Sequence, residues 1–219
     1  YCAAMITRRL ALKHFGLALA GASLPAVLRA EVGPVMATLS AYMAAARDRR
    51  LPADVLSATK HHLLDTLAAM VSGSELPPGK AALAFARQHA GVPVATVVAS
   101  PVVTSPMEAA LLNGVLAHSD ETDDSHGDSQ SHPGASVVPA SLAMGESLNI
   151  SGMHLLRAIA LGYDVGPRVT MALGAVTFRN ETRRSTHSIA GTFGSAAAAG
   201  CVASLTATQM RWLLRSEEH

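Results

Sequence analysis

The stretch from residue 118 to residue 132 has the residue types for proton transfer or metal binding, and it reads HSDETDDSHGDSQSH directly before Pro133. It holds five of the chain's 16 acidic residues and three of its 10 histidines, without a lysine or an arginine. The acidic residues follow an apolar helical pattern, so they crowd a helix C-terminus, where carboxylates oppose the helix dipole and repel one another. Because this arrangement costs stability, the stretch is the first place where we expect chemistry.

Three interpretations of this stretch are open. His118 and Glu121 lie about one helical turn apart and are possible metal ligands, although the spacing matches neither the twin-histidine zinc helix nor the calcium-binding loop. A solvated acidic loop is the second interpretation. In the third, a carboxylate at the helix end and a histidine on the following loop converge for acid–base catalysis, since histidine titrates near neutral pH and a carboxylate fixes its tautomer.

A second segment carries the opposite charge. Arg179, Arg183 and Arg184 precede the hydroxyl-rich run 185–188, which leads into a predicted helix with two early glycines. Basic side chains before a helix N-terminus suit an anion, and a metabolite that carries carboxylates is a natural ligand. The glycine spacing is too loose to indicate nucleotide binding, and a basic loop with a serine cap is the alternative.

The elements that would position these residues are almost all helical. The clearest start signal is the capping box that Ser105 and Glu108 form around a proline, and a strand-like stretch occurs only at 94–103. We therefore expect an all-α, Ala-rich domain with at most a small β-hairpin. Helices are predicted over 34–48, 52–73, 80–89, 105–118, 151–165, 188–203 and from 206 onward, with another that has Pro139 in its first turn and ends near Asn149; loops are predicted at 77–79 and 132–134, and 174–187 is polar and basic.

Composition agrees with this fold class and narrows the function. Apolar residues make up 49% of the chain and aromatic residues 4%, which indicates helices packed closely through small side chains. A net charge of +1 gives no electrostatic footprint for nucleic acid. Cys201 lies in an Ala-rich helical pattern, so we expect it to be a small buried apolar residue and expect no disulfide within the mature chain.

The first 30 residues have the pattern of an export signal. The basic pair Arg8–Arg9 precedes an apolar run over 15–27 that is too short to span a bilayer, and small-residue cleavage patterns follow. The arginine pair is similar to a twin-arginine signal, which predicts a periplasmic location. An amphipathic N-terminal helix and a cytoplasmic location are the alternative. No other stretch is long and apolar enough to predict a membrane span.

Several motifs together resemble one family. They are Asn113–His118, Asp123–Asp124, His132–Gly134, Pro139–Ala140, Gly162–Val165 with Arg168, and the segment 187–199. In combination they are similar to the MmgE/PrpD family, which includes 2-methylcitrate dehydratases and cis-aconitate decarboxylases, over about residues 34 to 212. The resemblance implies a helical domain followed by an α/β lid, a homodimer, no metal or organic cofactor, and proton transfer next to a substrate carboxylate.

The resemblance also implies roles for individual residues. His132 corresponds to the active-site histidine and would be the general acid or base, with Glu121 and Asp124 positioning or polarising it. The remaining candidates would bind substrate or orient the loop: His118, Asp123 and Ser125 in the acidic stretch, and Arg183, Arg184 and His187 in the basic segment, where an arginine would clamp a carboxylate.

Two hypotheses about function follow. The leading one is a cofactor-free lyase of the 2-methylcitrate dehydratase kind, which acts on a di- or tricarboxylate. The alternative is a non-catalytic metal- or anion-binding helical protein of the cell envelope. Because family members are considerably longer, we expect residues 31–219 to be the N-terminal part of the helical domain, truncated before the lid and inactive as a fragment.

Overall fold

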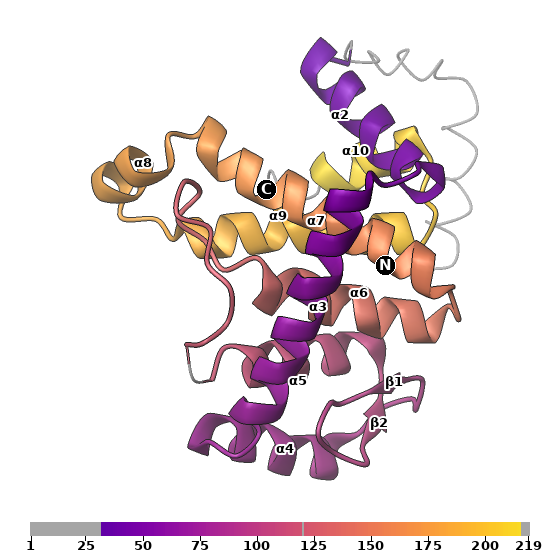
Figure 1. The fold of residues 1–219 in the computed structure, drawn as a ribbon, viewed down its shortest axis with the longest axis vertical. Helices are drawn as coiled ribbons and strands as arrows, with labels where there is room; N and C mark the ends of the chain where they lie inside the picture. Colours follow the sequence, from indigo (N-terminus) through magenta and orange to yellow (C-terminus); the bar gives the residue numbers. More distant parts are fainter. Residues whose placement is uncertain (1–31, 120, 216–219) are drawn as a thin grey trace, which may run out of the picture. The chain divides into compact units, whose positions relative to one another are not determined.

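The computed structural model of the chain describes residues 32–119 and 121–215, and the predicted export signal lies outside these residues. The unit that begins at Pro34 is built almost entirely of helices (Figure 1). Its elements in chain order are α2 (Pro34–Ala45), the 3₁₀ helix η1 (Ala46–Asp48), α3 (Ala53–Gly73), α4 (Pro77–His89), β1 (Ala95–Thr96), β2 (Val103–Thr104), α5 (Pro106–Ala117), α6 (Gly134–Ser147), α7 (Gly152–Ala172), α8 (Ala175–Thr182), α9 (Thr186–Val202) and α10 (Ala207–Arg215).

The prediction of an all-α domain with a small hairpin is confirmed. Within the described residues β1 and β2 form the only sheet, an antiparallel pair in which Ala95 lies opposite Thr104. Prolines at 93 and 101 flank the first strand and limit its length, because proline cannot donate to a strand ladder. None of the described helices is both long and apolar enough to cross a lipid bilayer.

Side-chain caps fix where several helices begin. The Ser105 side chain accepts a hydrogen bond from the Glu108 backbone N–H, and the Glu108 carboxylate accepts one from the Ser105 backbone N–H, which completes the predicted capping box of α5. Ser151 caps α7 through the His154 backbone N–H, as the sequence indicates. These start points matter because α5 delivers His118 at its opposite end.

The predicted loop at 77–79 is helical instead, whereas the one at 132–134 is confirmed for His132 and Pro133, and α6 starts earlier than expected. Residues 77–79 form the first turn of α4, because two prolines at the start of a helix need no backbone N–H. Helix α6 begins at Gly134, so Pro139 is its sixth residue rather than part of its first turn. At that position proline cannot donate to the carbonyl four residues earlier, so the Ala135 carbonyl loses its usual donor within the helix.

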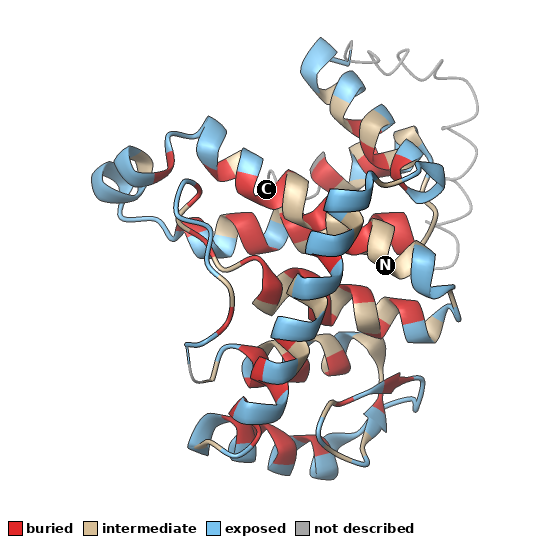
Figure 2. Cartoon of the chain, in the orientation of Figure 1, coloured by how far each residue is buried: buried red, intermediate tan, exposed pale blue. Residues whose placement is uncertain are grey.

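The polar segment 174–187 also contains a helix. Gly174 takes the left-handed conformation with φ of 90°, and α8 then runs from Ala175 to Thr182. Of the residues in α8 only Ala175 is buried, so α8 is the most solvent-exposed helix of its neighbourhood (Figure 2). The sequence did not predict this helix because residues 175–182 show no apolar face at helical spacing.

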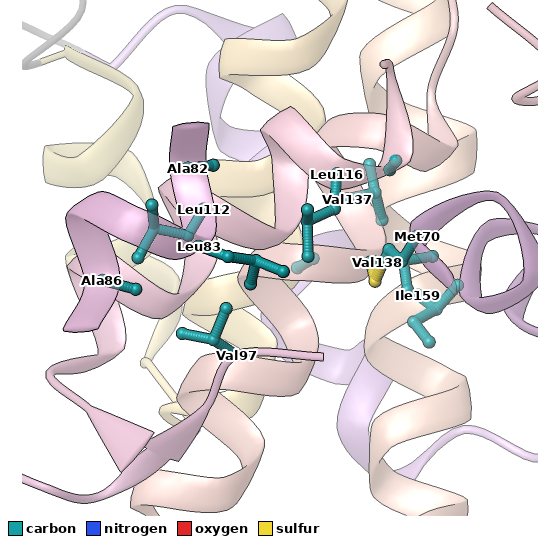
Figure 3. Close-up of a cluster of buried hydrophobic side chains, with 12 residues drawn as sticks. Met70, Ala82, Leu83, Ala86, Val97, Leu112, Leu116, Val137, Val138 and Ile159 are labelled. Atoms are coloured by element: carbon teal, nitrogen blue, oxygen red, sulfur yellow. The ribbon is translucent and has the colours of Figure 1, made fainter. Parts of the chain in front are cut away.

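The core beneath the acidic stretch joins α3, α5, α6 and α7. Met70, Leu116, Val138 and Ile159 have no exposed surface, and Val137 packs with them (Figure 3). Fully burying a side chain of this size is worth about 1.5–3 kcal/mol, so these contacts hold the end of α5 and the start of α6 together. The two histidines that flank the acidic stretch therefore emerge from a rigid base.

A second core lies between α7 and α9 and uses small residues. Gly166 faces the backbone of α9, where a Cβ on Gly166 would lie 2.5 Å from the Ala190 carbonyl oxygen and 3.1 Å from Gly194 Cα. Only glycine allows this separation of the two helices. Cys201 on α9 is buried in this core as predicted, and burial raises the pKa of its thiol to about 11, so it is not a reactive thiolate.

Candidate active site

Asp123 is the centre of the candidate site. Its side chain has no exposed surface, and its carboxylate oxygens lie 3.1 and 3.2 Å from His118 Nδ1. The second oxygen also lies 3.5 Å from His132 Nδ1. One buried carboxylate thus contacts two imidazoles, one at the C-cap of α5 and one just before α6.

His132 presents its other edge to solvent. Its Nδ1 atom is buried and has no hydrogen bond, since 3.5 Å to Asp123 is longer than a hydrogen bond and marks an ion-pair contact. The side chain is nevertheless 21% exposed. The accessible part of the ring therefore lies away from Nδ1, and His132 lines the neighbouring cleft.

Two further imidazoles surround His132. His187, in the first turn of α9, stacks on it with ring centroids 4.8 Å apart, and His118 meets it edge-on at 5.5 Å. Partial burial lowers the pKa of His187 first, and the neighbouring His132 and His118 lower it further. His187 is therefore held in its neutral form near pH 7, in which it both donates and accepts hydrogen bonds.

The histidines open into a cleft of about 470 Å³. Its size suits a small metabolite. Ala135, whose carbonyl is freed by Pro139, lies on its wall close to Gly114. The full set of lining residues is Gly114, His118, His132, Ala135, Ser136, Ser185, His187 and Ser188, most of which can hydrogen bond to a polar ligand.

A somewhat larger hollow of about 530 Å³ lies elsewhere, beside Arg50 and Arg157. It has neither a histidine nor a carboxylate among its lining residues, so it lacks a group that exchanges protons near neutral pH. The smaller cleft is therefore the candidate active site, and the larger hollow is lined by arginine and apolar side chains instead.

The loop that precedes His132 is closed on itself. The His126 backbone N–H donates to the Ser131 carbonyl at 2.9 Å, and the buried hydroxyls of Ser129 and Ser131 are 2.7 Å apart. Gln130 then ties this loop to the basic segment, because its side-chain oxygen accepts from Arg179 at 2.8 Å and its carbonyl accepts from the Thr186 hydroxyl at 2.6 Å. These contacts fix His132 relative to His187.

Asp124 points away from the cleft. It accepts hydrogen bonds from the Gly134 backbone N–H at 2.9 Å and from His62 Nδ1, which lies 3.2 Å away. Burial favours the protonated acid, but hydrogen bonds led by the one from His62 outweigh it and lower the pKa of Asp124. Its contacts anchor the N-terminus of α6, so Asp124 positions His132 through the backbone rather than through a contact with its ring.

The other predicted residues lie at or beyond the rim. Glu121 is 74% exposed, has φ of 59°, and its carboxylate lies 3.7 Å from His118 Nε2. Ser125 is exposed and is not among the cleft-lining residues. Arg183, in the left-handed conformation, and Arg184 are exposed in the turn before α9, and neither lines the cleft as it stands.

Four further residues around this site were not among the predicted site residues, although Gly114 and Tyr163 lie within the family motifs. Gly114 and Ser136 line the cleft, and their helical positions gave no polar signal. His62 contacts Asp124, and its ring lies 4.5 Å from that of Tyr163. Burial and the nearby Asp124 raise the pKa of Tyr163, which keeps its hydroxyl neutral. Both contacts join residues far apart in the sequence, so spacing alone could not show them.

The His62–Asp124 contact predicts a pH dependence of stability. The hydrogen bond to Asp124 raises the pKa of His62, so its stabilisation is complete below the unfolded value of about 6.5 and is lost as pH rises through the folded value. The lowered pKa of Asp124 makes its contribution present above about pH 4 and lost in acid. We expect His62→Gln to reduce the free energy of unfolding more at about pH 5.5 than at about pH 8.5.

Denaturant unfolding at the two pH values measures this difference. The matched control is His61→Gln, because His61 is the exposed neighbour on the same helix. An equal effect of His62→Gln at both pH values would contradict the assigned ion pair.

The same residues have the donor set of a metal site. Ligand atoms of His118, Asp123 and His132 all lie within 4.8 Å of one another. Two imidazoles and a carboxylate are suitable ligands for zinc and similar divalent ions. If a metal binds here, the buried Asp123 would be its acidic ligand rather than the exposed Glu121 of the sequence-based interpretation.

The helical fold and this histidine-lined cleft define a class of protein. The chain belongs to the MmgE/PrpD family, because the model of the MmgE/PrpD N-terminal domain matches residues 37–216. The chain is 31% identical over 180 residues to the cis-aconitate decarboxylase-like protein oryM of Aspergillus oryzae, and 32% identical over 164 residues to cis-aconitate decarboxylase of Homo sapiens. These matches cover 79% and 72% of the chain but 36% and 33% of the relatives, so the chain spans about a third of their length.

Proposed function

We propose that the protein is a lyase that acts on a di- or tricarboxylate without an organic cofactor. The observation that carries this proposal is the buried Asp123 carboxylate beneath His118 and His132 at the floor of an open cleft. The carboxylate fixes the orientation of the imidazoles that face it, which suits groups that transfer protons. The names of the two relatives favour decarboxylation of a cis-aconitate-like tricarboxylate over dehydration.

In a decarboxylation the bond between a substrate carbon and its carboxylate breaks, and the electron pair stays on the carbon while CO₂ leaves. Conjugation with the double bond and the remaining carboxylates stabilises this carbanion. Nε2 of protonated His132 then gives its proton to the carbon, and water restores the proton to the imidazole. In a dehydration neutral His132 would instead remove a proton next to a carboxylate, and the hydroxyl would leave as water with the proton that the resulting imidazolium returns to it.

The walls of the cleft suit the charged groups of such a substrate. Ser136, Ser185 and Ser188 offer hydroxyls, and Ser185 and Ser188 lie at the N-terminus of α9, where the helix dipole favours an anion. Arg183 and Arg184 lie in the turn directly before this helix. We assign them the role of clamping a substrate carboxylate when the turn closes over the ligand.

An ultraviolet assay tests the proposal. Full-length protein would be mixed with cis-aconitate, 2-methylcitrate and citrate, with and without a chelator, while the absorbance of the conjugated double bond is followed. Turnover that is insensitive to the chelator supports the cofactor-free lyase. Turnover or binding that the chelator abolishes favours the metal-binding alternative at His118, Asp123 and His132.

The homodimer and the export signal are part of the same proposal. Light scattering of the purified protein measures its oligomeric state. For export, exchanging Arg8 and Arg9 for lysines should move the protein from the periplasm to the cytoplasm, because the twin-arginine pathway requires the arginine pair. An unchanged compartment in cell fractionation would count against that route.

A further inference from the structure

We propose that the protein has a second ligand site, for a small polyanion, between the η1–α3 connection and α7. Two hollows of about 530 and 340 Å³ adjoin there, and both are lined by Arg50, Leu51, Pro52 and Arg157. Figure 1 shows this connection following α2, and η1 contacts α7. The hollows share no residue with the cleft of His118 and His132, so the inference is independent of the proposed lyase activity.

The lining of these hollows has an unbalanced positive charge. Arg49, Arg50 and Arg157 line them, and Asp164 is the only acidic residue that does. Asp164 already pairs with Arg168 at 2.5 Å and accepts a hydrogen bond from Tyr42. Across residues 32–119 and 121–215, the arginines in ion pairs are those at 47 and 168, so none of the three lining guanidinium groups has a carboxylate within ion-pair distance. Arg49 lies over the Tyr42 ring at 4.9 Å, and Arg157 acts at longer range on Asp48.

Arg157 is held in place for a ligand. One terminal nitrogen, Nη1, donates to the Arg47 carbonyl at 2.9 Å, which fixes the direction of the side chain. Its Nε atom is buried and has no hydrogen-bond partner among the described residues. Buried donors are almost always paired, so an unpaired guanidinium N–H beside a hollow points to a missing acceptor. A phosphate or carboxylate oxygen is the acceptor that a guanidinium binds best.

The N-terminus of α3 adds to the positive potential of these hollows. Ala53 and Leu56 line the larger hollow, and the N-cap residue Pro52 makes no side-chain hydrogen bond to the first turn. The first backbone N–H groups of a helix lack partners within the helix, and the dipole of this 21-residue helix favours an anion at that end. Leu56 and Met153 complete the wall of the larger hollow.

The ligand class follows from these donors. At least two guanidinium groups and a helix N-terminus face a space that accommodates a small metabolite, so the ligand carries two or more negative charges on phosphoryl or carboxylate groups. No histidine lines the space, so we assign it the binding of an anion rather than proton transfer. It gives the protein a place for a regulatory anion.

Calorimetric titration of full-length protein with inorganic phosphate, and separately with citrate, tests the site. We expect saturable binding of one phosphate per chain, and Arg50-sensitive binding of citrate in addition to any that occurs in the histidine cleft. Arg157→Gln should weaken it about tenfold or more, and Arg50→Gln about three- to tenfold because Arg50 is exposed. Arg87→Gln is the control, since Arg87 is an exposed arginine in the last turn of α4 and lines neither hollow.

The outcomes separate clearly. Phosphate binding that responds to Arg50→Gln but not to Arg87→Gln supports a phosphoryl ligand, and the same pattern with citrate supports a carboxylate ligand. Citrate binding that is unchanged by Arg50→Gln is assigned to the histidine cleft. If, in addition, no phosphate binding depends on Arg50, the second site does not exist. If Arg157→Gln unfolds because it loses the Arg47 contact, Arg50→Gln decides alone.

Discussion

Replacing His132 by asparagine is expected to lower kcat of the proposed lyase reaction by about 10²–10⁴-fold, the range for removal of a general acid or base. Asparagine keeps polarity and approximate size but cannot carry a proton between the cleft and the substrate carbon. Under the proposed function His132 acts on the reacting carbon more than it holds the substrate, so KM should change far less than kcat. Steady-state kinetics by ultraviolet absorbance measures both values.

The matched control is His61→Asn, an exposed histidine on α3 that lines no part of the cleft. Its kcat should equal that of the wild type. Circular dichroism of the His132→Asn variant must show an intact fold, because His132 is packed against His187. A folded His132→Asn variant that keeps more than about a tenth of wild-type kcat would remove His132 from its assigned role.

Gly166→Ala is expected to reduce the free energy of unfolding by about 2–3 kcal/mol and the melting temperature by roughly 4–12 °C. The added methyl group would meet the Ala190 carbonyl oxygen at 2.5 Å, and this is a backbone atom that cannot rotate away. Relief requires α7 and α9 to separate, which loosens the small-residue core between them. Thermal and denaturant unfolding measure the loss.

Gly152→Ala provides the comparison for this effect. Gly152 is the exposed first residue of the same helix, and a Cβ there meets nothing within 4 Å. Alanine at that position should leave stability unchanged or raise it by a few tenths of a kcal/mol, because alanine limits the unfolded chain more than glycine does. Equal stability of the two variants would show that α7 and α9 adjust to the extra methyl without cost.

Local signals in the sequence predicted much of the fold. The capping box at Ser105, the cap at Ser151 and the two-proline interruption of the strand-like stretch each act within a few residues, so they appear in the structure as expected. The start of α6 was predicted too late, because Pro139 favours a first turn in isolation. Packing of α6 on α5 and α9 offsets the free-energy cost of the backbone hydrogen bond that the proline removes.

The sequence predicted which residues gather at the candidate site but not which way each side chain points. Its histidines at 118 and 132 were identified from their flanking motifs. Spacing could not decide which of two consecutive aspartates faces them, since the chain has no regular period there: Asp123 is buried between the rings, and Asp124 turns to His62 on α3. That choice depends on the tertiary position of α3, which no local pattern encodes.

Gln130 has a consequence for how this enzyme family can diverge. It bonds to Arg179 on α8 and to Thr186 at the start of α9, and it lies two residues before His132. An insertion or deletion in the exposed α8 would shift this junction without changing any residue that lines the cleft. New substrate preferences can therefore arise from mutations in a solvent-exposed helix, where the hydrophobic core imposes little constraint, and libraries for altering specificity should include α8.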